Sequence, residues 1–296
     1  MVGFSVLQID VTSLVSNLWI LIFFMMLLVP SIQKWLLNSA RQELLVKISR
    51  KLKSEVITLI HRQETIAFLG IPLSRYIDIE DSEDVLRAIR LAPQDSPIVM
   101  ILHTPGGIAL AATQIALALS SHTAKKTVMV PHYAMSGGTL IALAADEIVM
   151  DPYAVLGPVD PQFTEGQDSF PAVSVVKVLE KKDINKVDDR TIILADEAKK
   201  AVDQMEVMVR RIMANRYPEQ TIQNVVDNLV VGKYTHDYPL TSGDAAALGL
   251  RVTTGVPTEV YRLMELYKME TGAKRPGVDY VPVIPSGPRE QPKAKP

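Results

Sequence analysis

The chain has 296 residues, of which 48% are hydrophobic and 22% are charged, and its formal net charge is −2. This length and composition fit one globular domain with additional segments. The near-neutral charge supplies no field that would attract nucleic acid, so we expect no nucleic-acid partner. The absence of cysteine excludes disulfides, thiolate metal ligands and a cysteine nucleophile. With five histidines and no HExxH spacing, we expect no metal site.

The first feature along the chain is an apolar segment. Residues 11–33 carry no charge, and residues 18–29 form an unbroken apolar run. Since a spanning helix needs about 20 mostly apolar residues, we predict one transmembrane helix over residues 11–33. Residues 1–10 would then be a short extracytoplasmic N-terminus. The alternative is a cleaved signal peptide, but such peptides begin with a basic region, and no Lys or Arg precedes residue 34.

Basic residues follow the apolar segment. They are Lys34, Arg41, Lys47, Arg50, Lys51 and Lys53. By the positive-inside rule, we expect a single-pass protein of the cell membrane with its C-terminal bulk in the cytoplasm. Apolar residues at helical spacing predict a juxtamembrane basic helix over residues 34–54. Its basic cluster either contacts anionic lipid headgroups or forms a solvated helix face.

Residues 55–272 alternate between strand-like and helix-like segments. We predict strands at 56–60, 65–69, 97–102, 127–130 and 147–150. We predict helices at 81–91, 108–120, 139–145, 189–215, 218–229, 242–248 and 256–271. This alternation is typical of an α/β domain with parallel strands. The tail at residues 273–296 is Pro-rich and short of large apolar groups, so we expect it to be disordered.

Two glycine pairs stand at strand-to-helix turns. The first ends the motif HTPGG at 103–107, and the second follows Ser136 in the motif YAMSGG at 133–138. Parallel strands present such turns at one sheet edge, where α/β sites form. A serine at such a turn is exposed, and N–H groups from both turns can face one developing oxyanion. The pattern predicts a serine acyl-transfer site, and the alternative is that the glycines only permit tight helix packing.

A serine nucleophile needs a general base. The histidine candidates are His61, His103, His122, His132 and His236. His236, which is adjacent to Asp237, is the strongest of them. A lysine can serve if burial removes its proton, and Lys199 and Lys200 border apolar positions on the predicted helix at 189–215. The ordinary interpretation of both lysines is a solvent-facing charged helix surface.

Four motifs resemble the Clp protease/crotonase superfamily. They are HTPGG at 103–107, YAMSGGTLIALAADEIVMDPYAVLGPVDPQ at 133–162, DDRTIILADEAKKAVDQ at 189–205 and YTHDYPLTSGDAAALGL at 234–250. More closely, the chain resembles the membrane-bound serine dehydrogenase proteinase family, which is related to signal peptide peptidase A and the stomatin-operon proteases. The resemblance covers roughly residues 55–255 and the preceding apolar segment. It implies a Clp protease/crotonase-like α/β fold of stacked ββα units.

The resemblance also assigns roles to residues of the two glycine turns. Ser136 matches the nucleophile. Gly107 and Gly137 match the backbone donors of the oxyanion hole, and Gly106 lies beside them in the same loop. Asp237 falls where the Clp protease has its triad aspartate.

The general base is less clearly assigned. The Clp histidine would fall near Pro158, where this chain has no histidine. Related membrane peptidases use a Ser–Lys dyad, and their lysine falls near Lys199 and Lys200. We favour Lys200, then Lys199, with His236 as the alternative base. A looser placement by loop gives the lysine position as 177 or 182.

Together these features imply a membrane-anchored serine peptidase that hydrolyses peptide bonds without a cofactor. We expect polypeptide substrates, membrane proteins among them, and a homo-oligomer with its catalytic domain in the cytoplasm. Two other functions stay open. One is a catalytically inactive scaffold that binds peptides at the membrane, and the other is a crotonase-type acyl-CoA enzyme. The absence of GxGxxG leaves nicotinamide binding, and so a dehydrogenase activity, without a basis.

Overall fold

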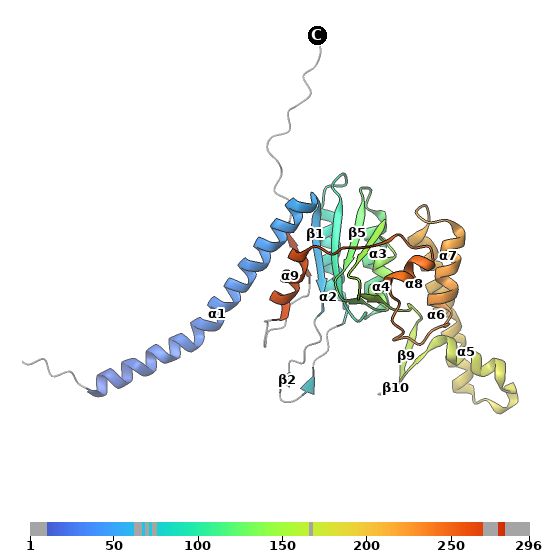
Figure 1. The fold of residues 1–296 in the computed structure, drawn as a ribbon. Coiled ribbons are helices and arrows are strands. Elements are labelled where there is room, and N and C mark those ends of the chain that lie inside the picture. The colour runs from blue at the N-terminus through green and yellow to red at the C-terminus, as the bar shows by residue number, and fades with distance from the viewer. Residues whose placement is uncertain are drawn as a thin grey trace, which may run out of the picture. The chain divides into compact units, whose positions relative to one another are not determined.

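The computed structural model describes residues 11–61, 67–68, 71–72, 76–165, 168–268 and 278–281 (Figure 1). The N-terminus at residues 1–10 lies outside them, as does most of the strand predicted at 65–69, where β2 (Ala67–Phe68) is described. The chain divides into two compact units, Met1–Leu44 and Leu45–Pro296.

Helix α1 (Val11–Leu52) contains the segment that we predicted to cross a membrane. Among the residues that the structure describes, no helix is long and apolar enough to do so. The transmembrane helix predicted at 11–33 is therefore not supported. Four of residues 11–17 are Thr, Ser or Asn, so the unbroken apolar run is confined to residues 18–29. The predicted cell-membrane location stays a prediction from the sequence.

The second unit is built on a six-stranded sheet with the order β11-β7-β5-β4-β1-β12 (Figure 1). Its strands are β1 (Glu55–Ile60), β4 (Ile98–His103), β5 (Lys126–Val130), β7 (Glu147–Met150), β11 (Val252–Thr254) and β12 (Val278–Val281). All neighbours pair in parallel except β12, which pairs antiparallel with β1. Strands β1, β4 and β5 are buried along their whole length, as expected where helices cover both faces of a parallel sheet. The predicted α/β fold with parallel strands is confirmed.

Strand β12 corrects the prediction for the C-terminal tail. We expected residues 273–296 to be disordered, yet Val278–Val281 pair with β1 in the register Val56↔Val281. Valine and tyrosine side chains suit an edge strand, which explains why this short stretch adds to the sheet. The other residues of the tail lie outside the described part of the chain.

Helices surround the sheet near the positions that the periodicity predicts. They are α2 (Ile79–Leu91), α3 (Ala109–Ser121), α4 (Gly137–Ala142), α6 (Asp189–Met213), α7 (Glu219–Val225), α8 (Ser242–Ala247) and α9 (Thr258–Lys268). The predicted helix 218–229 ends as α7 and passes into a π-helical turn at Val226–Val230. The hairpin of β9 (Gln162–Glu165) and β10 (Asp168–Pro171) and helix α5 (Ala172–Lys181) were not predicted.

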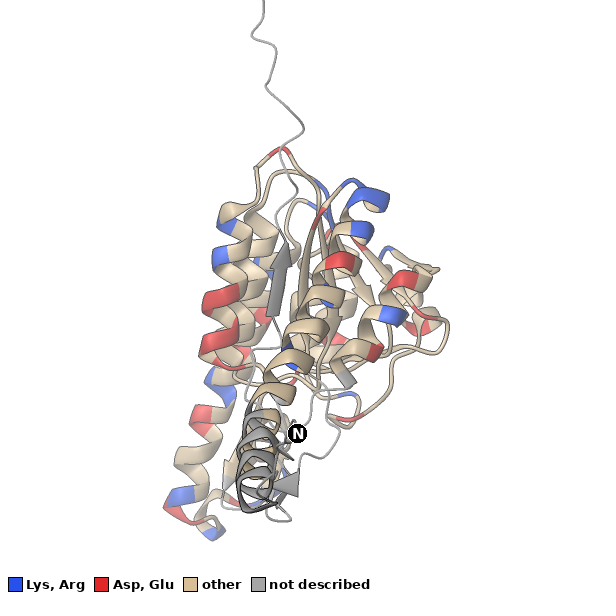
Figure 2. Ribbon diagram, turned by 90° about the vertical axis from the view of Figure 1, so that its left-hand side faces the viewer, with Lys and Arg blue, Asp and Glu red and all other residues tan. Residues whose placement is uncertain are grey.

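Charged side chains of both signs are interspersed over the helices. Figure 2 shows Lys and Arg together with Asp and Glu along the same helices. Salt bridges between neighbouring turns account for part of this pattern, as for Arg87 with Asp84 and Arg210 with Glu206. Such surface pairs contribute little to stability. The buried strands β1, β4 and β5 therefore matter more for the stability of the fold.

Candidate active site

Ser136 lies at a strained turn between strand β6 (Tyr133–Ala134) and helix α4. Its backbone has φ 50° and ψ −116°, a combination that a residue with a Cβ rarely adopts. Although Ser136 is the N-cap of α4, its side chain makes no capping hydrogen bond. The residue is half-buried. The turn therefore holds an uncommitted hydroxyl in a strained position, which is where functional residues tend to occur.

The first glycine loop is joined to this turn by backbone hydrogen bonds. Thr104 N–H donates to Tyr133 O at 3.2 Å, and Met135 N–H donates to Thr104 O at 2.9 Å. A Cβ added to Gly106 would lie 2.8 Å from Cβ of Ser136, so only glycine permits this approach. The two turns that the sequence pairs are therefore in direct contact.

Two backbone N–H groups close to Ser136 have no hydrogen-bond partner among the described residues. Gly107 N lies 3.7 Å from the position that a Cβ would take on Gly137. Within the described part of the chain, the N–H groups of Gly107 and Gly137 donate no hydrogen bond. Gly106 differs, because its N–H already donates to Thr104 Oγ1 at 3.2 Å. Gly107 and Gly137 thus fit the predicted oxyanion donors, whereas Gly106 supports their loop.

A third segment runs beside the serine turn. Strand β8 (Val155–Leu156) pairs in parallel with β6, with Ala134 opposite Leu156. Beyond this pair, Gly157 N–H donates to Thr139 Oγ1 of α4 at 3.0 Å. On its other side Leu156 exchanges two backbone hydrogen bonds of 2.9 Å with Leu240. The loop that precedes Leu240 therefore packs onto the segment next to the serine.

This loop brings His236 to a buried carboxylate. His236 Nδ1 lies 2.8 Å from Asp160 Oδ1, and Gln162 Nε2 donates to Asp160 Oδ2 at 2.7 Å. The Asp160 side chain is fully buried, whereas the His236 side chain is 33% exposed. No described residue bonds to Nε2 of His236. A carboxylate on Nδ1 fixes the ring and leaves Nε2 to accept a proton, as in a Ser-His-Asp triad.

Aromatic stacking stabilises the turn that carries His236. The rings of Tyr234 and Tyr238 stack with centroids 4.2 Å apart, and Tyr238 N–H donates to Thr235 O at 3.0 Å. Asp237, which the resemblance places at the triad aspartate, is exposed. It is Asp160, and not the adjacent Asp237, that holds the His236 ring.

The two lysines favoured from the sequence are exposed and paired. Lys199 Nζ lies 2.8 Å from Asp203 Oδ2, while Lys200 Nζ lies 2.7 Å from Asp196 Oδ2 and 2.9 Å from Glu197 Oε1. The hydrogen bonds that Lys200 donates, to Asp196 first and Glu197 second, raise its pKa. A lysine base must lose its proton near neutral pH, so these contacts act against that role.

The other histidines occupy different surroundings. His103 is buried and His132 is exposed, and their rings stack with centroids 5.6 Å apart. His122 caps α3, with Nε2 2.8 Å from Ser96 O. His61 is buried against Asp81, with 3.1 Å between Nε2 and Oδ2. Among the described residues, no three His, Asp or Glu side chains form a group that could hold a metal ion.

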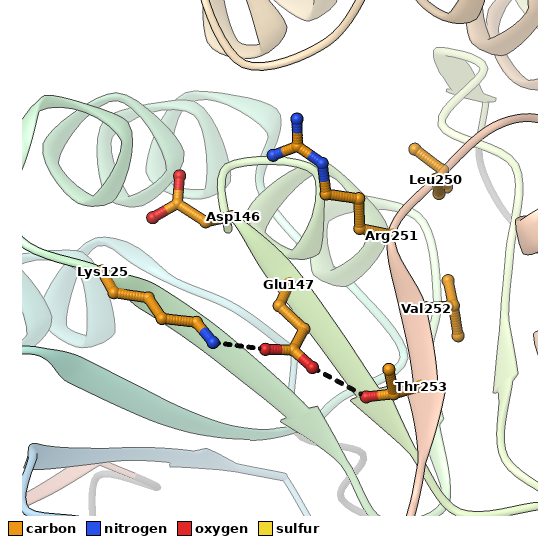
Figure 3. Close-up of a pocket in the computed structure, with 7 residues that line it drawn as sticks. All are labelled: Lys125, Asp146, Glu147, Leu250, Arg251, Val252 and Thr253. Atoms are coloured by element: carbon orange, nitrogen blue, oxygen red, sulfur yellow. Dashed lines mark hydrogen bonds and ion pairs between the residues drawn. The ribbon is translucent and has the colours of Figure 1, made fainter.

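Two cavities open at the opposite edge of the sheet. One of about 550 Å³ is lined where β5, β7 and β11 begin (Figure 3). Within it Lys125 Nζ lies 2.6 Å from Glu147 Oε2, and Thr253 Oγ1 donates to Glu147 Oε1 at 2.9 Å. The hydrogen bond from Lys125, then that from Thr253, lowers the pKa of Glu147. Since Ser136 follows the carboxyl ends of the strands, this cavity does not belong to its site.

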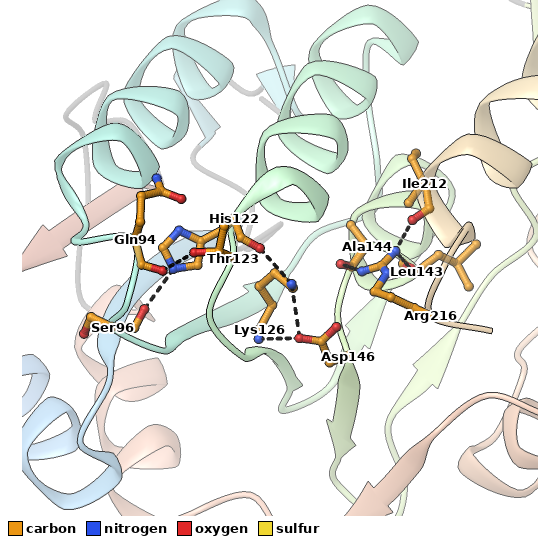
Figure 4. Close-up of polar contacts among 10 residues, drawn as sticks. All are labelled: Gln94, Ser96, His122, Thr123, Lys126, Leu143, Ala144, Asp146, Ile212 and Arg216. Atoms are coloured by element: carbon orange, nitrogen blue, oxygen red, sulfur yellow. Dashed lines mark hydrogen bonds and ion pairs between the residues drawn. The ribbon is translucent and has the colours of Figure 1, made fainter.

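The second cavity, of about 360 Å³, is lined in part by Arg216, whose hydrogen bonds fix the C-terminal end of helix α4. The Arg216 guanidinium donates to the carbonyl oxygens of Leu143, Ala144 and Ile212 (Figure 4). Burial lowers the pKa of Arg216. These bonds satisfy carbonyls at the end of α4 and tie it to α6, which fixes the helix that begins after Ser136.

Comparison with known proteins assigns the family. The sequence profile of the ClpP-like SDH-type serine proteinases matches residues 6–295. The chain belongs to this family. The resemblance found from the four motifs is confirmed, and so is the ClpP-like α/β fold.

Relatives of this family occur in an archaeon. The chain is 54% identical over 267 residues to the uncharacterized protein MJ0137 of Methanocaldococcus jannaschii, covering 90% of this chain and 92% of that protein. It is 49% identical over 275 residues to MJ1495 of the same organism, covering 93% and 92%. A shorter match, 35% identical over 81 residues, joins 26% of this chain to 23% of the probable protease SohB of Haemophilus influenzae.

Similar solved structures are more distant. A mutant of the 1510-N membrane-bound stomatin-specific protease is 18% identical, with a TM-score of 0.43, covering 64% of this chain and 79% of that one. A mutant of ClpP1 from Listeria monocytogenes is 14% identical, with a TM-score of 0.44, covering 72% and 98%. The family assignment therefore rests on the sequence match.

Sequence reasoning missed Asp160. The motif comparison pointed to its segment, because the Clp histidine would fall near Pro158, but a histidine was sought there and not an acid. A buried aspartate two residues further on was the available signal. Only the pairing of β6, β8 and the loop before Leu240 joins it to His236.

Proposed function

We propose that this protein is a serine peptidase in which Ser136 is the nucleophile, His236 the general base and Asp160 the residue that orients His236. The strained Ser136 turn beside two unbonded N–H groups carries this proposal. Membership of a serine proteinase family supports the reaction class. The pairing of His236 with Asp160, on the segment that continues from β8, supports the choice of base.

The reaction follows from these groups. Nε2 of His236 takes the proton of the Ser136 hydroxyl as Oγ attacks the peptide carbonyl carbon. The N–H groups of Gly107 and Gly137 bind the carbonyl oxygen as it becomes an oxyanion. The same proton passes to the leaving amine, and an acyl-serine forms. A water molecule then gives its proton to His236, attacks the acyl group and releases the acid, which restores Ser136.

The proposed triad exchanges the two polar positions of the Clp arrangement. Where the resemblance places the Clp histidine, near Pro158, this chain has Asp160. Where it places the Clp aspartate, at Asp237, the neighbouring residue is His236. The acid, Asp160, would thus lie on the segment that carries the histidine in the Clp protease. The base, His236, would lie on the segment that carries its aspartate. This accounts for the missing histidine without a Ser–Lys dyad.

Polypeptide substrates and a homo-oligomer are also part of the proposal. Membership of a serine proteinase family supports polypeptide substrates, and the homo-oligomer is carried over from the resemblance to the Clp protease/crotonase superfamily. Membrane-protein substrates have only the apolar sequence at residues 18–29 in their favour. Light scattering on the purified full-length chain measures the number of subunits directly.

The test is covalent labelling of the full-length protein with a fluorophosphonate, beside cleavage of casein and a peptide library. Ser136→Ala removes the label and the cleavage, and His236→Ala and Asp160→Asn slow both. If Lys200→Ala loses labelling and cleavage while His236→Ala stays active, the Ser–Lys dyad would be the better assignment. No label on a folded wild type would favour the peptide-binding scaffold. Turnover of an acyl-CoA that survives Ser136→Ala would favour the crotonase-type enzyme.

A further inference from the structure

Three buried side chains that the proposed mechanism does not use form a chain of polar contacts leading to the glycine loop. His61 follows β1, Asp81 lies in the first turn of α2, and Thr104 follows β4. Their exposed fractions are 2%, 4% and 0%. His61 Nε2 lies 3.1 Å from Asp81 Oδ2, and His61 Nδ1 lies 2.9 Å from Thr104 Oγ1. Thr104 Oγ1 in turn accepts a hydrogen bond from Gly106 N–H at 3.2 Å.

Burying these three polar side chains costs free energy unless each of them is hydrogen-bonded. Neighbouring residues in the same three elements, among them Leu59, Ile60 and Leu102, are buried and apolar. An unpaired polar group in such surroundings loses its hydration without compensation, whereas a fully bonded network fixes one geometry. Asp81 is itself held, because Asp78 N–H donates to its Oδ2 at 3.0 Å. The carboxylate end of the network is thus anchored in the capping box of α2.

With a neutral His61 ring, the contacts give the hydrogen bonds one direction. A carboxylate accepts, so Nε2 of His61 carries the hydrogen that points to Asp81. The Thr104 hydroxyl has two acceptors in reach, His61 Nδ1 at 2.9 Å and Gly106 O at 3.4 Å. The shorter contact is within the normal range and the longer is at its limit. The network therefore runs from Gly106 N–H through the Thr104 hydroxyl and His61 to Asp81.

The glycine loop is where this network meets the proposed site. Gly106 is in contact with Ser136, with 2.8 Å between Cβ of Ser136 and a Cβ built on the glycine. Its own φ is +101°, a left-handed conformation that needs to be held. The next residue, Gly107, provides one of the two unbonded N–H groups. A shift of Gly106 therefore moves an oxyanion donor.

We infer that Asp81, His61 and Thr104 act as a positioning unit that holds the Gly106–Gly107 loop in the geometry that the oxyanion requires. None of the three touches the reacting atoms, so they are positioning residues and not catalytic ones. The inference rests on the proposed peptidase function. It adds that the activity of Ser136 depends on a second Asp–His pair, which the acyl-transfer chemistry does not use.

The experiment compares Thr104→Val with Thr104→Ser in the full-length protein. Valine keeps the shape of threonine and loses the hydroxyl, and serine keeps the hydroxyl. Since a misplacement of about 1 Å costs about 10²-fold, we expect Thr104→Val to slow fluorophosphonate labelling of Ser136 by about that factor. Thr104→Ser should restore the rate to within about threefold of wild type. In peptide cleavage the loss should fall on kcat, with KM nearly unchanged, because the loop binds the oxyanion that forms only during reaction.

His61→Leu, with His122→Leu as its matched control, tests the middle of the network. Both histidines are buried to a similar degree, but the ring of His122 bonds to Ser96 at the opposite edge of the sheet. Labelling should slow with His61→Leu and stay at the wild-type rate with His122→Leu. Equal slowing by both variants would mean general destabilisation and would overturn the inference. Should His61→Leu fail to fold, the two Thr104 variants decide the question.

A readout without catalysis separates this inference from the proposed function. Hydrogen–deuterium exchange, measured by mass spectrometry on the peptide that contains Gly106, should quicken with Thr104→Val and not with Thr104→Ser. If wild-type Ser136 takes no label, the proposed function fails, and the exchange comparison alone decides the positioning role. The inference is overturned if Thr104→Val is labelled at the wild-type rate, or if its Gly106 peptide exchanges hydrogen at the wild-type rate.

Discussion

His236 and Asp160 are 76 residues apart in the sequence, yet His236 Nδ1 lies 2.8 Å from Asp160 Oδ1. Asp237, the acid adjacent to His236, is exposed and takes no part in this contact. The pair thus joins two segments that meet only in the folded chain, next to the turn that carries Ser136. The first prediction follows from the difference between the two acids.

Asp160→Asn should lower kcat for peptide cleavage by about 10³- to 10⁴-fold, as expected when a triad histidine loses the carboxylate that orients it. Steady-state kinetics should show a KM close to wild type. Asp237→Asn is the matched control, and its kcat should be unchanged because the Asp237 carboxylate is exposed. Equal losses in the two variants would contradict the assignment of Asp160.

Lys199→Ala and Lys200→Ala should leave both kcat and the thermal unfolding midpoint close to wild type. Each lysine is exposed and forms an ion pair with a neighbouring carboxylate. For Lys200 the hydrogen bonds to Asp196 and then Glu197 raise the pKa, which favours the charged form that cannot accept a proton. Cleavage assays and differential scanning calorimetry measure the two quantities. A large fall in kcat for either variant, with the midpoint retained, would revive the lysine as base.

Ser136→Gly should abolish activity and at the same time stabilise the fold. The φ of 50° at Ser136 is strained for a side chain with a Cβ and relaxed for glycine. Relief of such strain is worth about 1–3 kcal/mol, and the added flexibility of the unfolded chain offsets about half of it. We therefore expect the free energy of unfolding to rise by about 1 kcal/mol in urea titrations. Ser136→Ala, which keeps the Cβ, should be inactive without this gain.

Gly107→Ala should disrupt the oxyanion loop. A Cβ on Gly107 would lie 2.3 Å from both the backbone N and O of Ile77, and backbone atoms cannot move aside cheaply. We expect a loss of more than about 2 kcal/mol in unfolding free energy together with loss of labelling, by analogy with overpacked cores. Gly243→Ala serves as the control, since its Cβ would meet only Thr241 Oγ1 at 3.7 Å. A Gly107→Ala protein as stable and active as wild type would show that this loop is placed wrongly.

The Lys125–Glu147 pair gives a pH-dependent prediction. Hydrogen bonds from Lys125 and then Thr253 lower the pKa of Glu147 from 4.5. A lowered pKa in the folded state stabilises the fold above the unfolded-state value, and this contribution disappears as the pH falls through the folded-state value. Glu147→Gln should therefore cost less than about 1 kcal/mol at pH 7, because Lys125 is exposed, and a smaller amount at a pH of about 3. Urea titrations at the two pH values measure this, and a difference that grows on acidification would contradict it.

The chain order of strands, glycine turns and helices was readable from the sequence. Period-2 and period-3.6 patterns place most of the elements, and the pairing of two glycine turns at strand ends places Ser136, Gly107 and Gly137 at one edge. These features are local or follow from the rule that parallel strands end at a common edge. The predictions at the two ends of the chain fared worse. No helix among the described residues is long and apolar enough to cross a membrane, and β12 pairs with β1 within a tail that we expected to be disordered.

The polar partners of Ser136 were decided by the tertiary structure. The sequence favoured Lys200 as the base, with His236 as the alternative, because sequence does not show which of them meets a carboxylate in solvent and which meets one inside the protein. Asp160 lies 76 residues from its histidine, and the network from Asp81 to Gly106 is assembled from three separate elements. The sequence by itself determined the candidate nucleophile and the candidate oxyanion donors, since these are features of single turns. Folding decided which titratable side chains share a buried contact, since burial and distance exist only once the strands have paired.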